Sequence, residues 1–207
     1  MSRWPVTLSE GPIELRPLRQ RDRGAWDEVR LRNHAWLQEW EATLPPGGRP
    51  GPKTFTAFVR MMNRQARRGT TLPWLVWVDD RLAGQLTVSN ITYGSANGAT
   101  LGYWIDQALA GRGIIPMCVA LATDHCLGQM GLHRMEIAIR PENTKSLRVV
   151  EKLGFRPEGV RRSFLHINGE WRDHAIFALT EAEMPPGGLV NAYKNGGLTD
   201  TRGQITP

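Results

Sequence analysis

A turn punctuated by glycines, set between an apolar strand and a long helix, constrains this chain more than any other feature. The residues run Gly102-Tyr-Trp-Ile-Asp-Gln-Ala-Leu-Ala-Gly-Arg-Gly-Ile-Ile-Pro116. Gly111 and Gly113 allow a ligand to approach the backbone closely, and the helix that follows begins with unpaired N–H groups at the positive end of its dipole. Because this combination suits a phosphate or pyrophosphate group, the sequence predicts a phosphorylated cofactor.

The length and composition of the chain indicate one α/β domain followed by a tail. With 207 residues, the chain can bury a substantial core. No apolar run approaches the roughly 20 residues that span a bilayer, and the N-terminus has no apolar segment typical of a signal peptide. We therefore expect a cytoplasmic protein that has no membrane partner.

Charge and cysteine content narrow the class of protein further. The 26 Lys and Arg residues against 20 Asp and Glu residues give a net charge of +6, which suggests an anionic partner. The arginines are spread along the chain, however, and we expect most of them on solvated faces. Cys118 and Cys126 fall in one predicted helix, and the 5 histidines have no metal-ligand spacing. We expect buried thiols, no metal and no required nucleic acid.

Apolar periodicity predicts helices and strands that are interleaved along the chain. The expected helices lie at residues 18–32, 35–42, 54–68, 114–130 and 143–153, and the expected strands at 13–16, 72–78, 82–88, 100–105, 133–140, 156–165 and 171–179. This order predicts a mixed sheet flanked by helices, in a domain at residues 1–183. Residues 184–207 are polar and contain several glycines, so we expect a flexible tail there.

Three ordered motifs make the chain resemble the GCN5-related N-acetyltransferases (GNAT). They are the run 102–116, then Arg140-Pro-Glu-Asn-Thr-Lys-Ser146, and then Glu151-Lys-Leu-Gly-Phe-Arg-Pro-Glu-Gly159. The segments Ile13-Glu-Leu-Arg-Pro-Leu and Asn168-Gly-Glu-Trp-Arg-Asp-His174 narrow the likeness to the RimJ/RimL-type ribosomal-protein N-terminal acetyltransferases, and to RimJ above all. The resemblance implies an α/β GNAT fold, in which a mixed, mostly antiparallel sheet splays into a central V.

The resemblance also implies that acetyl-CoA is the cosubstrate and that its pyrophosphate binds at the glycine turn. Ala108 stands where the family motif has a leading Gln or Arg, so backbone amides are expected to make most of the contacts. The strand at the V is implied to be bulged and to pair with the pantetheine arm, and Asn143 is implied to lie beside that arm. The residues implied at the cofactor are therefore Tyr103, Trp104, Ile105, Ala110, Gly111, Arg112, Gly113, Ile114 and Asn143.

Two residues are candidates for catalysis, Ser146 by the resemblance and Glu136 by its place on the strand opposite the cofactor, and each has a structural alternative. Ser146 is expected to protonate the leaving thiolate or to hold a water that does so, although Asn143 and Ser146 also fit a helix N-cap and its third position. Glu136 is a candidate general base, with a surface salt bridge as the alternative. Leu165 stands where RimL-type enzymes carry an acidic residue, so that candidate is absent, and a water chain without a carboxylate base remains open.

The acceptor wall of this family is a short helix, which corresponds to residues 35–42 and carries Trp40 and Glu41. Glu41 is a candidate for holding the incoming ammonium group. We expect direct acetyl transfer in a ternary complex, because neither cysteine falls in a predicted site turn. The resemblance implies that the acceptor is the α-amino group of a protein, an Ala or Ser at the N-terminus of a ribosomal protein. Two alternatives are a small-molecule amine, such as an aminoglycoside or polyamine, and a non-catalytic acyl-CoA-binding or ribosome-associated module. A monomer and a homodimer both fit the sequence.

Overall fold

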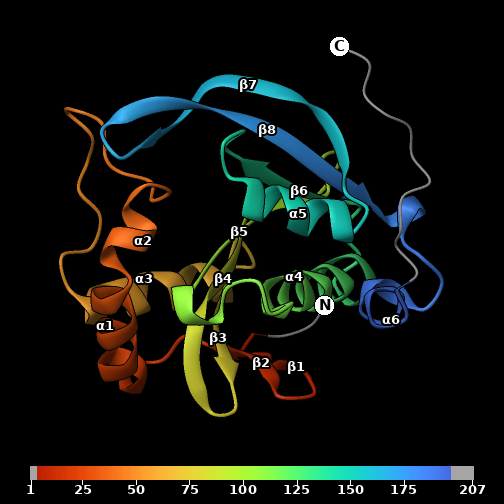
Figure 1. Cartoon of the computed structure of the whole chain (residues 1–207), viewed down its shortest axis with the longest axis horizontal. Helices are drawn as coiled ribbons and strands as arrows, with labels where there is room; N and C mark the ends of the chain where they lie inside the picture. The colour runs from red at the N-terminus through yellow and green to blue at the C-terminus, as the bar shows by residue number, and fades with distance from the viewer. Residues whose placement is uncertain (1–3, 197–207) are drawn as a thin grey trace.

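The computed structural model describes residues 4–196, in which eight strands form one mixed sheet (Figure 1). The strand order is β1-β2-β3-β4-β5-β6-β8-β7, and each neighbouring pair is antiparallel except β5 with β6. This architecture confirms the fold class that the sequence implied. The strands are β1 (Leu8–Glu10), β2 (Ile13–Pro17), β3 (Leu72–Val78), β4 (Arg81–Thr92), β5 (Gly98–Ile105), β6 (Arg134–Ile139), β7 (Arg156–Ile167) and β8 (Glu170–Thr180).

Helices cover both faces of this sheet because successive side chains of the strands point to opposite faces. In β3, Trp74 and Val76 belong to one hydrophobic cluster and Leu75 to another, and all three are fully buried. Helices α4, α5 and α6 contribute to the first cluster, and α1 and α3 to the second. The helices are α1 (Arg23–Arg32), α2 (His34–Gln38), α3 (Phe55–Arg67), α4 (Ile114–Asp124), α5 (Thr144–Lys152) and α6 (Gly188–Lys194).

Several boundaries differ from those that the sequence indicates. The long helix expected at 114–130 is α4 followed by a π-helical turn, η3 (His125–Gln129), and α2 is shorter than expected. Three further single turns are η1 (Gln20–Asp22), η2 (Gln107–Leu109) and η4 (Glu181–Glu183). The helices described between residues 4 and 196 are all too short or too polar to cross a membrane.

The segment after residue 184 is not loose as far as the structure describes it. Asp124, the last residue of α4, accepts hydrogen bonds from the N–H groups of Leu189 (2.7 Å) and Val190 (3.0 Å). These N–H groups lie in the first turn of α6 and have no acceptor within the helix, so Asp124 supplies one. Leu189 is fully buried in the cluster that contains α4. The expectation of a tail with little to bury is therefore wrong for residues 188–194, whereas residues 197–207 lie outside the described part of the chain.

Candidate active site

Strands β5 and β6 pair over three residues each and then diverge. Gly98, Ala99 and Thr100 pair with residues 134–136 of β6 in parallel. Beyond this point β5 continues to pair with β4, and β6 pairs with β8 along its entire length. In the described part of the chain, no strand covers the facing edges of residues 101–105 and 137–139. The V that the sequence resemblance implied is present, and its free edges can accept an extended ligand as an added strand.

The bulge expected at Tyr103, Trp104 or Ile105 is not found there. Residues 100–105 pair with β4 in an unbroken register. The register shift lies instead between Ser89 and Thr92 of β4, at the closed end of the V. A bulge increases the local twist of a strand pair, so one placed at this end turns β5 relative to its neighbours before the V opens.

The glycine turn lies after β5, at the open end of the V, and presents free backbone amides. Gly111 and Gly113 have left-handed φ values of 80° and 79°. Within the described residues, the N–H groups of residues 111–115 have no hydrogen-bond acceptor, whereas the N–H of Ala110 donates to the carbonyl of Gln107 at 3.2 Å. The expectation that the Ala110 N–H binds a ligand is therefore wrong, because this N–H already donates within the turn. The free N–H of Ile115, which was not among the expected residues, takes its place in the row of amides.

A buried polar cluster centred on Asp106 fixes this turn. The Asp106 carboxylate accepts hydrogen bonds from Arg32 Nε and Nη2 (3.0 and 2.6 Å), Asn33 Nδ2 (3.0 Å) and the Ala108 N–H (3.2 Å). Asn33 Oδ1 accepts from the Gln107 N–H at 2.8 Å. Burial alone would raise the pKa of Asp106, but the hydrogen bonds from Arg32 and its other partners hold that pKa below its usual value.

No sequence motif indicates this cluster, although one of its members carries a local signal. An Asp directly after a strand is a typical N-cap, and Asp106 is the N-cap of η2. Its partners come from the junction of α1 and α2, more than 70 positions earlier in the chain, so no sequence spacing relates them. The cluster connects the glycine turn to the junction of α1 and α2.

Ser146 lies in the first turn of α5 and contacts β5 through its hydroxyl. Ser146 Oγ is 2.7 Å from Tyr103 Oη, and the Ser146 N–H donates to Asn143 Oδ1 at 3.1 Å. Asn143 is thus the N-cap of α5, which is the structural alternative stated above. Burial is the main cause that raises the pKa of Tyr103 to about 12, so its phenol stays protonated as a hydrogen-bond donor.

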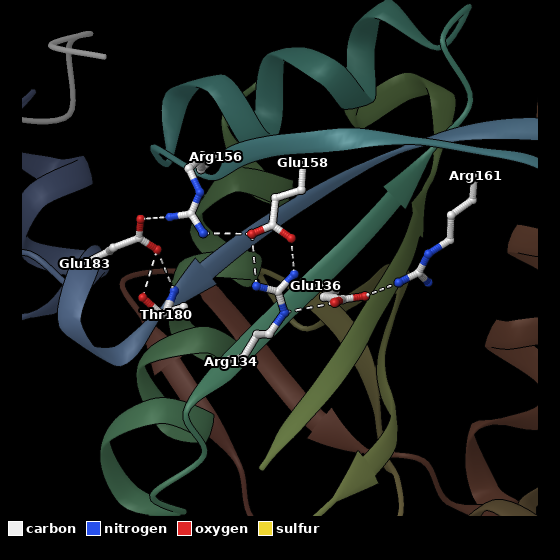
Figure 2. Close-up of polar contacts among 7 residues, drawn as sticks. All are labelled: Arg134, Glu136, Arg156, Glu158, Arg161, Thr180 and Glu183. Carbon is white, nitrogen blue, oxygen red and sulfur yellow. Dashed lines mark hydrogen bonds and ion pairs between the residues drawn. The ribbon is translucent and has the colours of Figure 1, made fainter. Parts of the chain in front are cut away.

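Glu136, the candidate base, belongs to a network of ion pairs shown in Figure 2. Its carboxylate accepts hydrogen bonds from Arg134 Nε at 2.9 Å and from Arg161 Nη2 at 3.2 Å. Arg134 also donates to Glu158 Oε1 at 3.0 Å, and Arg156 donates to the same oxygen at 2.7 Å. Both partners of the Glu136 carboxylate are guanidinium groups of this chain, so the structure favours the salt-bridge alternative for Glu136.

The same network joins the end of β8 to its neighbouring strands. Arg156 pairs with Glu183, and Glu183 accepts hydrogen bonds from the N–H and hydroxyl of Thr180, both at 2.9 Å (Figure 2). The Arg134 hydrogen bond, partly opposed by burial and aided by Arg156, lowers the pKa of Glu158 to about 2. The network therefore connects β6, β7 and η4 through charged side chains.

A tryptophan that the sequence analysis did not single out lies at the end of β5. Trp36 of α2 donates its indole N–H to the carbonyl of Ile105 at 3.1 Å, and Lys145 of α5 lies over the Trp36 ring at 4.1 Å. This side chain therefore connects the end of β5 to α5 across the open end of the V. Its only sequence signal is its place in the short helix already expected to wall the acceptor site.

Trp40 and Glu41 both have partners within the protein. The Arg140 guanidinium lies over the Trp40 ring at 5.0 Å, and Glu41 forms an ion pair with Arg30. Arg30 also lies over the Trp104 ring at 5.4 Å. An incoming ammonium group would have to compete with Arg30 for the Glu41 carboxylate. Glu41 is therefore less suited to bind the substrate amine than its position suggested.

Comparison with known proteins agrees with this geometry. A family model described as an acetyltransferase (GNAT) domain matches residues 13–156. The chain belongs to the GNAT acetyltransferase family. The crystallised RimJ of Mycobacterium smegmatis, in complex with CoA-disulfide, is similar to this GNAT chain with a TM-score of 0.86 and 33% identity, over 94% of this chain and 96% of that one.

Two curated proteins are also similar in sequence. The [ribosomal protein uS5]-alanine N-acetyltransferase of Escherichia coli K12 is 28% identical over 164 residues, which cover 78% of this chain and 77% of that protein. The probable N-acetyltransferase YjcK of Bacillus subtilis is 41% identical over 101 residues, which cover 49% of this chain and 56% of that protein. These relatives confirm the likeness to RimJ-type acetyltransferases that the motifs indicated.

The cysteines of this GNAT chain do not provide a nucleophile. Cys118 and Cys126 are both fully buried, and burial raises the pKa of each thiol to about 12. Thiolates are the nucleophilic form of cysteine, so neither side chain is suited to form an acyl intermediate. Among residues 4–196, no three His, Cys, Asp or Glu side chains are grouped so that they could hold a metal ion.

The ion pairs of Glu158 predict a pH-dependent contribution to stability. Its pKa is about 2 in the fold, and about 4.3 is typical of an unfolded chain. The stabilisation is therefore complete above about pH 5 and is lost as the pH falls towards 2. We expect Glu158→Gln to lower the free energy of unfolding at pH 7, in urea denaturation, and the difference from wild type to shrink steadily below about pH 5.

Glu151→Gln is the matched control, since Glu151 is exposed on α5 and forms no ion pair within the described residues. This control should change the free energy of unfolding little, both at pH 7 and near pH 3. A Glu158→Gln effect of the same size at pH 7 and near pH 3 would contradict the assignment.

Proposed function

We propose that this chain transfers the acetyl group of acetyl-CoA to the α-amino group of a protein N-terminus, and that the acceptor is a ribosomal protein. The observation that carries the proposal is the row of free amides at residues 111–115, placed where β5 and β6 have diverged. Support comes from the similarity to M. smegmatis RimJ, which is in complex with CoA-disulfide.

The residues at the open end of the V fit the acetyl donor. A Cβ at Gly111 would meet nothing within 4 Å, so the space in front of the turn is open. The free amides, at the positive end of the α4 dipole, would hold the diphosphate, and the exposed Arg112 would add a positive charge. The free edges of β5 and β6 would hold the pantetheine arm by backbone hydrogen bonds, as an added strand does.

Acetyl transfer requires a neutral amine, a donor to the developing oxyanion and a proton for the leaving thiolate. The neutral amine nitrogen attacks the thioester carbon and a C–N bond forms. The nitrogen, positively charged after the attack, loses one proton to water, and the C–S bond breaks. We assign the oxyanion donor to a backbone N–H on the free edge of β5. We assign the thiolate proton to the Ser146 hydroxyl, which lies 2.7 Å from Tyr103 Oη. Ser146 then recovers a proton from the water that took the proton of the amine.

The reaction does not need a dedicated carboxylate base. Glu136 is already bonded to two arginines, and Glu41 is paired with Arg30. An α-amino group has a pKa of about 8, so a useful fraction is neutral near physiological pH and water can carry its proton away. This property favours an N-terminal amine over a lysine side chain, whose pKa is about 10.4.

The acceptor side of the cleft favours a peptide. The segment after α2 runs beside the β7–β8 hairpin: Ala42 forms an isolated bridge with Ile167, and the Thr43 N–H donates to the carbonyl of His166 at 2.8 Å. The cleft is thus bordered by extended backbone as well as by Trp36 of α2. The net charge of +6 disfavours a polycationic acceptor such as a polyamine. The similarity to the uS5-alanine acetyltransferase supports a ribosomal protein.

The acceptor class can be tested with a panel of amines. We expect thiol release from acetyl-CoA with peptides that carry the Ala or Ser N-termini of ribosomal proteins, and none with the same peptides already acetylated at the N-terminus. Mass spectrometry should place the new acetyl group on the α-amino nitrogen. Preferential acetylation of polyamines or aminoglycosides would overturn the acceptor class, and CoA binding without release from any amine would overturn catalysis.

The site of the diphosphate can be tested at Gly111. We expect Gly111→Val to abolish CoA binding in calorimetric titration, because the side chain would fill the space before the amides and strain a residue with φ of 80°. Gly94→Val is the matched control, since Gly94 has φ of 78°, is equally open, and lies in the turn between β4 and β5 at the closed end of the V. Unchanged CoA affinity in Gly111→Val would refute the placement.

The proton donor can be tested at Ser146. We expect Ser146→Ala to lower kcat about 100-fold and to change acetyl-CoA affinity little, because general acid catalysis contributes roughly 100- to 10,000-fold. Glu136→Gln serves for comparison and should lower kcat less than about threefold. Equal losses of kcat and affinity in Ser146→Ala would indicate a binding role, and a loss of about 100-fold in Glu136→Gln would identify Glu136 as the base.

A further inference from the structure

Tyr193 brings a hydroxyl group from α6 to the glycine turn. A Cβ at Gly113 would lie 3.1 Å from Tyr193 Oη, so the hydroxyl is close to the N-cap of α4. The Tyr193 side chain is half-buried, and its hydroxyl has no hydrogen-bond partner within the described residues. A free hydroxyl therefore lies beside a row of free amides, and both kinds of group can donate to the same ligand.

The position of this hydroxyl is fixed by two further contacts of α6. Asp124 accepts the N–H groups of Leu189 and Val190 with both carboxylate oxygens, and Leu189 is fully buried. The contact requires a close backbone approach, because a Cβ at Gly188 would lie 2.7 Å from Asp124 Oδ2. Since Asp124 and Gly113 are at opposite ends of α4, α6 runs back along α4 from one end towards the other.

We propose that Tyr193 Oη donates a hydrogen bond to the diphosphate of CoA, together with the amides of residues 111–115, so that α6 forms part of the acetyl-donor site. Burial raises the pKa of Tyr193, which keeps its hydroxyl protonated as a donor. The inference rests on the donor placement proposed above. It assigns a binding role to a segment that the sequence indicated as a tail.

The test compares Tyr193→Phe with the wild-type full chain on three ligands: CoA, dephospho-CoA, which lacks the 3′-phosphate, and pantetheine, which lacks all phosphate. We expect the Kd of CoA and of dephospho-CoA to rise by the same factor, roughly tenfold, as for the loss of a hydrogen bond to a charged group. The Kd of pantetheine should not change. Tyr93→Phe is the matched control, since Tyr93 is exposed and its hydroxyl donates to the carbonyl of Gly69.

Three outcomes would overturn the inference. They are an unchanged CoA affinity in Tyr193→Phe, a loss confined to CoA and absent for dephospho-CoA, and an equal loss for pantetheine. Thermal unfolding of the variant shows whether α6 still packs, because the phenylalanine ring keeps the apolar contacts of the tyrosine. Loss of CoA binding in Gly111→Val with none in Tyr193→Phe would refute the role of Tyr193 alone, whereas no effect in Gly111→Val would refute the donor placement itself.

Discussion

The site depends on how β6 pairs with its two neighbouring strands, β5 and β8. β6 pairs with β5 only at residues 134–136 but with β8 over its full length, so β5 and β6 face each other across a gap with unpaired edges. Unpaired backbone groups need hydrogen-bond partners, and an extended ligand can supply them. The ion pairs among Arg134, Glu158 and Arg156 connect β6 to β7 across β8, on the side of β6 that is away from the gap (Figure 2).

Backbone groups form most of the proposed donor site, and charged side chains at a distance hold them in place. Asp106 binds the turn before the free amides and connects it to α1 through Arg32. Asp124, at the other end of α4, holds α6 and so places Tyr193 beside Gly113. A substitution at either aspartate would act on the ligand through the backbone, which separates these positioning residues from Ser146, whose hydroxyl we place at the reacting sulfur.

The sequence predicted those parts of the structure whose signals are local. The glycine turn, the Asn143 cap and the apolar periodicity each lie within one short segment, and together they indicated the order of the elements and the family. The contacts that fix roles are between distant segments, and no spacing reveals them. Glu136 meets Arg161 only because β6 and β7 lie on either side of β8, and Asp106 meets Arg32 only because α1 packs beside the turn. Helix α6 is too short for periodicity to identify, and its burial depends on α4.

Backbone amide signals of the isotope-labelled full chain test the central claim most directly. On addition of CoA, the account predicts the largest NMR shift changes and the strongest slowing of hydrogen exchange at residues 111–115, because those N–H groups have no acceptor in the described structure without a ligand. Binding of CoA with residues 111–115 unchanged, and with protection confined to another face of the sheet, would contradict it.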